Sequence, residues 1–230
     1  LSLHDALPIS RAVDQRTVFA SLFPRAAVGH TTPLLFTDAH PRLVAALYAN
    51  LCSFALDYAA RQKIGGTHLT YSYLKQLPVL PPFTYATAAP WHHGSTILLA
   101  DFILARVLEL TYTAWDLEPF AQDVGYEGPP FRWDSVRRFL LRAELDAAFF
   151  HLYGLSHDDI DYILGTFPIV RKNDVRVHGE YRTKRVILEI YDAMAESART
   201  GVPYITRLDP PPSDPRIAHP PRPPVTEDAR

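Results

Sequence analysis

Apolar side chains recur at steps of three and four residues between positions 43 and 58, and this period constrains the fold more than any other feature. Such spacing places the side chains on one face of an α-helix. We expect the helix to begin near Asp38 or Pro41 and to end before Gly65-Gly66, because paired glycines favour a stop. The recurring residues are Leu43, Ala46, Leu47, Leu51, Phe54 and Tyr58.

Short runs of aromatic and branched residues predict β-strands on both sides of this helix. Residues 18–23 and 33–36 are separated by the turn-prone stretch 29–32, which favours a hairpin. Residues 67–73 alternate as a half-buried strand does. Residues 77–82 then leave in extended conformation, because successive prolines exclude a helix.

The second half of the chain is predicted to be helical. One helix is expected over 97–115, and another from the N-cap residue Asp134 to 153–154, where a glycine offers a stop. Residues 156–159 resemble a capping box, with Asp in place of Glu, that opens a short helix. The last helix is expected over about 180–198.

These elements predict an α+β fold in three parts. A small mixed subdomain covers 11–90 and a helical C-terminal subdomain covers 91–200. Residues 201–230 are rich in proline, which predicts a polyproline-like, largely disordered tail.

The composition favours a cytoplasmic protein. A single cysteine, Cys52, cannot form an internal disulfide, and no Cys/His cluster has the spacing of zinc ligands, so no metal is expected. The most hydrophobic window is interrupted by Asp101, Arg106 and Glu109, which are costly in lipid. We therefore expect no membrane partner.

Charge is distributed unevenly along the chain. The formal net charge is −2, which argues against an independent nucleic-acid binder. Between residues 11 and 90, however, the sequence contains seven basic residues and only three acidic ones. Any nucleic-acid surface is therefore expected in the first third. The basic residues are Arg11, Arg16, Arg25, Arg42, Arg61, Lys63 and Lys75, and the acidic ones are Asp14, Asp38 and Asp57.

Residues 1–10 are excluded from the fold prediction. They lack the basic segment of a signal peptide and resemble a translated sequencing-library adapter, which indicates an assembly artefact. The natural protein is then expected to extend upstream of Arg11.

Two stretches carry a resemblance to a known family. Residues 49–82 contain Ala60-Arg61-Gln62-Lys63-Ile64-Gly65-Gly66 and end in Leu74-Lys75-Gln76-Leu77-Pro78-Val79-Leu80-Pro81-Pro82. They resemble the recognition region of type IIG restriction-modification enzymes and related large adenine-specific DNA methyltransferases. Residues 140–156, followed by 179–185, are similar to the helical C-terminal segment of the same families. The resemblance covers most of 11–200.

The resemblance implies that 11–90 is a target-recognition subdomain for double-stranded DNA. Methyl transfer from S-adenosylmethionine would belong to an upstream catalytic methyltransferase domain, and no cofactor is expected on this chain. The residues expected to contact DNA are Arg61, Lys63, Gly65, Gly66, Thr67, His68, Tyr71, Tyr73 and Lys75. A helix ending in cations, followed by glycines that expose backbone amides, suits phosphate binding.

A structural interpretation of the same residues stays open. Arg61 and Lys63 would then end a helix favourably against its dipole, and the tyrosines would belong to the core.

No complete active site is expected. The stretches 80–83 and 128–131 each contain Pro-Pro-Phe but lack the polar residue that an adenine methyltransferase places before it to accept hydrogen bonds from the target amine. Glu144, Asp146 and His151 are interpreted as solvated or salt-bridged helix residues, because no partner histidine has the required spacing.

We therefore predict the DNA target-recognition and C-terminal part of an adenine-specific methyltransferase. One alternative is a non-catalytic protein-interaction scaffold of an anti-phage defence complex. A second is a DNA-binding module like that of a type I specificity subunit, although the sustained heptads expected after such a module are not found beyond residue 90.

Overall fold

The computed structural model describes residues 14–24, 26–29, 34–65, 69–92 and 97–222. These residues form helices joined by extended segments and contain no β-strand, only the isolated bridges Ala88–Leu98 and Phe131–Ala218. The predicted α+β fold with a mixed subdomain is therefore wrong. The α-helices are α1 (Pro41–Cys52), α2 (Phe54–Lys63), α3 (Tyr71–Leu74), α4 (Leu99–Thr111), α5 (Glu118–Asp123), α6 (Ser135–Leu152), α7 (His157–Gly165), α8 (Pro168–His178) and α9 (Arg182–Thr200). Short 3-10 helices are η1 (Pro82–Ala86), η2 (Trp115–Leu117) and η3 (Pro215–Ile217).

The helix predicted from residue 41 to 64 is broken in two at Ser53. This residue has an extended backbone, and α1 and α2 are bent by 59° about it. The Ser53 hydroxyl donates to the carbonyl of Asn50 at 2.8 Å and accepts from the amide of Leu56 at 3.3 Å. One side chain therefore closes α1 and caps α2, as serine does at helix N-termini.

The predicted strands fail because they lack partners. Residues 18–23 are extended and alternate in burial, with Val18 buried and Phe19 68% exposed, but no described segment pairs with them. Residues 34–36 form no regular element, and residue 33 lies outside the described part. Within 67–73, Thr70 caps α3 by accepting from the amide of Tyr73, so a helical turn replaces the expected strand.

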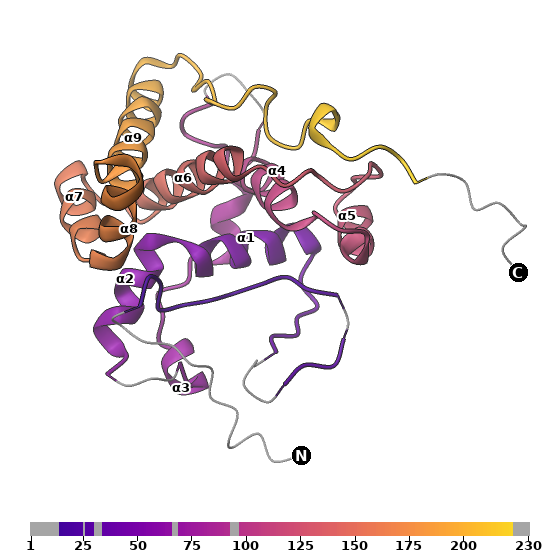
Figure 1. Cartoon of the computed structure of the whole chain (residues 1–230), viewed down its shortest axis with the longest axis horizontal. Coiled ribbons are helices and arrows are strands. Elements are labelled where there is room, and N and C mark those ends of the chain that lie inside the picture. Colours follow the sequence, from indigo (N-terminus) through magenta and orange to yellow (C-terminus); the bar gives the residue numbers. More distant parts are fainter. Residues whose placement is uncertain (1–13, 25, 30–33, 66–68, 93–96, 223–230) are drawn as a thin grey trace, which may run out of the picture.

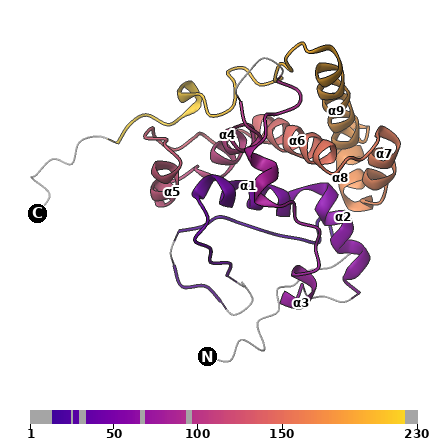
Figure 2. The same ribbon diagram turned by 180° about the vertical axis from the view of Figure 1, so that it is seen from behind.

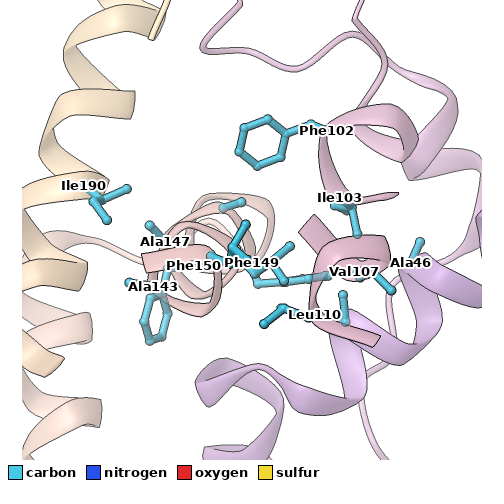
Figure 3. Close-up of a cluster of buried hydrophobic side chains, with 14 of the residues drawn as sticks. Ala46, Phe102, Ile103, Val107, Leu110, Ala143, Ala147, Phe149, Phe150 and Ile190 are labelled. Atoms are coloured by element: carbon cyan, nitrogen blue, oxygen red, sulfur yellow. The ribbon is translucent and has the colours of Figure 1, made fainter. Parts of the chain in front are cut away.

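Helices α1, α4, α6 and α9 surround the main core (Figure 3). Large buried side chains such as Phe149 and Ile103 fill the space between them, and Ala46 and Ala147 allow close helix approach. Two predicted caps are confirmed: Asp134 accepts from the amide of Arg137, and Ser156 forms a capping box with Asp159. Helix α8 was not predicted.

The C-terminal segment packs on the helices, so the prediction of a disordered tail is wrong for 201–222. Tyr204 and Leu208 are buried, and the amide of Ser213 donates to Glu109 of α4 at 2.9 Å. Figure 1 shows this segment running along α4 and α6. An extended chain lacks helical hydrogen bonds. The apolar side chains between the prolines of this segment compensate by burying apolar surface against the helices.

No single helix among the described residues is long and apolar enough to cross a membrane. The bent pair α1 and α2 meets the length and composition criteria only when the two helices are taken together.

Candidate nucleic-acid interface

The end of α2 and the short helix α3 form the candidate interface, at the lower edge of the molecule in Figures 1 and 2. A second, smaller core holds both elements. It consists of Val18, Leu51, Leu56, Ala60, Ile64 and Leu77, with Leu69, Tyr73 and Leu74 packed against it. The buried side chains of Ile64 and Leu77 therefore fix both ends of the segment that carries the predicted contacts.

Lys63 and Lys75 project from this small core into solvent. Lys63 is the last residue of α2 and Lys75 is the C-cap of α3, and both are exposed. Neither forms an ion pair with a carboxylate of the described residues. Tyr71, which lies one helical turn before Lys75 in α3, is 38% exposed. Two ammonium groups and one aromatic ring are therefore available to a ligand here.

Other predicted contacts are divided between open surface, core and undescribed chain. A Cβ added to Gly65 would meet no atom within 4 Å, so the backbone there is accessible from one side. The half-buried Tyr73 belongs to the small core. Gly66, Thr67 and His68 lie outside the described residues.

Arg61 points inward instead of toward this surface. Its side chain is 6% exposed, and its Nε lies 3.2 Å from the carboxylate of Asp57, one helical turn earlier. Its guanidinium also donates to the carbonyl of Asp14 and stacks over the ring of Phe167 at 4.0 Å. Phosphate binding by Arg61 would require breaking these contacts.

Three basic residues of the first third pair with carboxylates of the described part of the chain. Arg42 pairs with Asp101 at 2.8 Å, Arg16 approaches Asp146 at 3.6 Å, and Arg61 pairs with Asp57. Two of these carboxylates come from α4 and α6, beyond residue 90. Among the described Lys and Arg residues of 14–90, only Lys63 and Lys75 have no such partner.

A hydrogen-bond network around the buried Asn50 joins the two stretches that carry the family resemblance. Asn50 accepts from the amide of Leu80 at 3.0 Å and donates to the hydroxyl of Tyr153 at 2.8 Å. That hydroxyl donates in turn to the carbonyl of Pro78 at 2.7 Å. The Leu-Pro exit segment is thereby fixed against α1 and α6. The sequence prediction did not identify Asn50, because its partners lie about 30 and 100 residues away.

The side chains of Glu144, Asp146 and His151 in α6 contact other parts of the fold. Glu144 is fully buried against Arg106. His151 stacks on Tyr191 with ring centroids 3.9 Å apart, and burial lowers its pKa. No group of three His, Cys, Asp or Glu side chains in the described part of the chain could hold a metal ion.

Asp146 belongs to α6, and its carboxylate reaches the start of α2, where it accepts from the amide of Phe54 at 2.8 Å. The guanidinium of Arg16 stacks over the Phe54 ring at 3.3 Å and partly compensates the carboxylate. Burial nevertheless raises the pKa of Asp146 to about 6, whereas Arg16 and the Phe54 amide act to lower it.

The raised pKa of Asp146 predicts a pH-dependent stability. The ordinary pKa of Asp is near 4, so between about pH 4 and 6 the native state binds more protons than the unfolded state. The free energy of unfolding should therefore fall as pH rises through this interval, by up to about 3 kcal/mol relative to an Asp146→Asn variant. Denaturant titrations of both proteins from pH 4 to 7 test this. A difference that does not change with pH would contradict it.

No family model matches the chain, and neither a curated protein nor a solved structure matches it.

Proposed function

We propose that this chain binds double-stranded DNA as the target-recognition and C-terminal part of an adenine-specific methyltransferase of the restriction-modification type. The observation that carries the proposal is a pair of exposed cations, Lys63 and Lys75, which have no carboxylate partner among the described residues and lie on a surface fixed by the small core. The resemblance of 49–82 and 140–156 supports the choice of family. The Asn50–Tyr153–Pro78 network supports treating the two stretches as one unit.

In this proposal Lys63 and Lys75 neutralise backbone phosphates, while Tyr71 and the exposed backbone at Gly65 contact the nucleotides between them. Lysine contacts of this kind orient a protein on the duplex without reading its sequence. Base reading would come from other residues of the segment between the two lysines. The upstream methyltransferase domain would bind S-adenosylmethionine and perform the transfer.

A Lys63→Ala/Lys75→Ala variant is expected to bind duplex DNA about ten-fold more weakly at moderate salt, because two phosphate contacts are lost. The slope of log affinity against log salt should decrease in magnitude by about 2. Fluorescence anisotropy with a labelled duplex between about 50 and 200 mM salt measures both quantities.

The matched control is Arg199→Ala/Arg216→Ala, which removes the same charge from two exposed sites that already have carboxylate partners. Its affinity and slope should stay near those of the parent chain. Equal losses in the two variants would show a nonspecific charge effect and contradict the assignment. Failure of the parent chain to bind duplex DNA at any salt would contradict the proposed function.

A protein-interaction scaffold is the second candidate, and exposed aromatic side chains favour it. Phe36 is 86% exposed, Phe83 75% and Phe19 68%. Side chains this exposed are available to pack against a partner protein. The scaffold would show no DNA binding at low salt, and it would lose partner binding when Phe36 and Phe83 are replaced by serine.

A further inference from the structure

Helix α8 is a short helix with defined ends and little burial. Pro168 occupies its first turn, and Gly179 ends it in the left-handed conformation with φ 74°. Val170 is its one buried residue. Asp174 accepts from the amide of Thr183 at 2.6 Å and so ties α8 to the start of α9. The helix is therefore held from one side and leaves its other side open.

The open side of α8 carries three cations, Arg171, Lys172 and Arg176, all exposed. None of them forms an ion pair with a carboxylate of the described residues. Asp174 is the only acidic residue in α8, and its carboxylate is directed to the amide of Thr183. The charge of this side is therefore not balanced by the part of the chain that the structure describes.

The spacing of these cations is unfavourable for an isolated helix. Lys172 and Arg176 are four residues apart, so they lie on one face about 6 Å apart along the axis. Like charges in this relation repel and destabilise a helix. An anionic ligand that contacts both would remove the repulsion.

A shallow pocket of about 470 Å³ adjoins the first turn of α8 and extends the basic surface. Arg171 lines it together with Tyr181, Lys184 and Arg185. Lys184 already pairs with Asp161, and Arg185 pairs with Glu180 and Glu189. Arg171 is therefore the cation of this pocket that has no carboxylate partner among the described residues.

Helix α8 is also connected to the candidate interface. Phe167, the N-cap of α8, lies under the guanidinium of Arg61 near the end of α2. In Figures 1 and 2, α2 lies between α3 and the end of the molecule formed by α7, α8 and α9. A duplex contacting Lys63 and Lys75 could extend along this edge toward α8.

We propose that α8 is a second DNA-contacting element, which binds backbone phosphates through Arg171, Lys172 and Arg176. The inference rests on the proposed function and adds a surface that lies outside residues 49–82. Arginine suits this role because its guanidinium can bind a phosphate through two hydrogen bonds.

The test compares three double variants of the full chain against one labelled duplex across a salt series. Lys172→Ala/Arg176→Ala should weaken binding about ten-fold and reduce the magnitude of the salt slope by about 2. Arg199→Ala/Arg216→Ala, which removes equal charge, should change neither. The exchange Lys172→Arg/Arg176→Lys, which keeps both charges, should retain parental affinity. Circular dichroism confirms that the variants keep their helical content.

The outcomes separate the two proposals. If Lys63→Ala/Lys75→Ala loses affinity while Lys172→Ala/Arg176→Ala does not, the role of α8 is overturned and the proposed function stands. If the α8 variant loses affinity no more than the Arg199/Arg216 control, α8 is likewise excluded. If the parent chain binds no duplex at any salt concentration, both the proposed function and the role of α8 are contradicted.

Discussion

A Glu144→Ala variant is expected to lose about 3–5 kcal/mol of unfolding free energy, because it breaks a buried ion pair and leaves a cation without its partner. Glu144 is fully buried in α6 and accepts from Arg106 of α4 at 2.6 and 2.8 Å. The same carboxylate accepts from the hydroxyls of Tyr204 and Thr206 at 2.8 and 2.6 Å. One side chain therefore joins two core helices to the C-terminal segment.

Arg106 determines the size of the effect. Its guanidinium stacks over Phe102 at 3.4 Å and donates to the Phe102 carbonyl at 2.7 Å, so it cannot leave the interior easily. Burial already lowers the pKa of Arg106, and Glu144 opposes that change. An Arg106→Met/Glu144→Leu double variant should therefore be more stable than Glu144→Ala, since no uncompensated charge remains.

Denaturant unfolding of the variants measures these differences. The control is Glu196→Ala, which breaks the exposed pair with Arg199 and should cost less than about 1 kcal/mol. Limited proteolysis gives a second readout, because loss of the Tyr204 contact should release the C-terminal segment. A Glu144→Ala loss no larger than that of the control would show that the network contributes little.

Local signals in the sequence predicted α4, α6, α7 and α9 but neither α5 nor α8. Asp134 and Ser156 act through amides three residues away, so their caps are visible in a short window. The break at Ser53 is supported by Asp146, which accepts from the amide of Phe54, 92 residues earlier in the chain, and no local pattern reveals this contact. The strand prediction for 18–23 recognised the alternation in burial, but a sheet also needs a partner strand, and the described chain supplies none.

The candidate interface shows the same division between local and distant information. The exposure of Lys63 and Lys75 follows from their places at helix ends. The inward direction of Arg61 depends partly on Phe167, which is distant in sequence, although Asp57 at four residues before it was a local signal for an ion pair. The cations of α8 were also visible, but a charge total that averages over the acidic remainder of the chain conceals them.

An Asp57→Ala variant should also lose about 3–5 kcal/mol, because a buried carboxylate with three donors is removed. Asp57 is 1% exposed and accepts from the amides of Thr17 and Val18, both at 2.7 Å, and from Arg61. These bonds hold the extended segment against α2. Hydrogen exchange should show faster exchange at Thr17 and Val18, while Asp123→Ala at an exposed helix end should change stability by less than about 0.5 kcal/mol.

The Asp57→Ala variant also distinguishes two roles for Arg61. If Arg61 serves only the fold, DNA affinity measured where the variant remains folded should equal that of the parent chain, and Arg61→Ala should lower stability without lowering affinity. If Arg61 instead contacts DNA, release from Asp57 should strengthen binding, since a cation without its carboxylate is free to reach a phosphate. Tighter DNA binding by the Asp57→Ala variant would therefore show that Arg61 can contact DNA once its buried ion pair is removed.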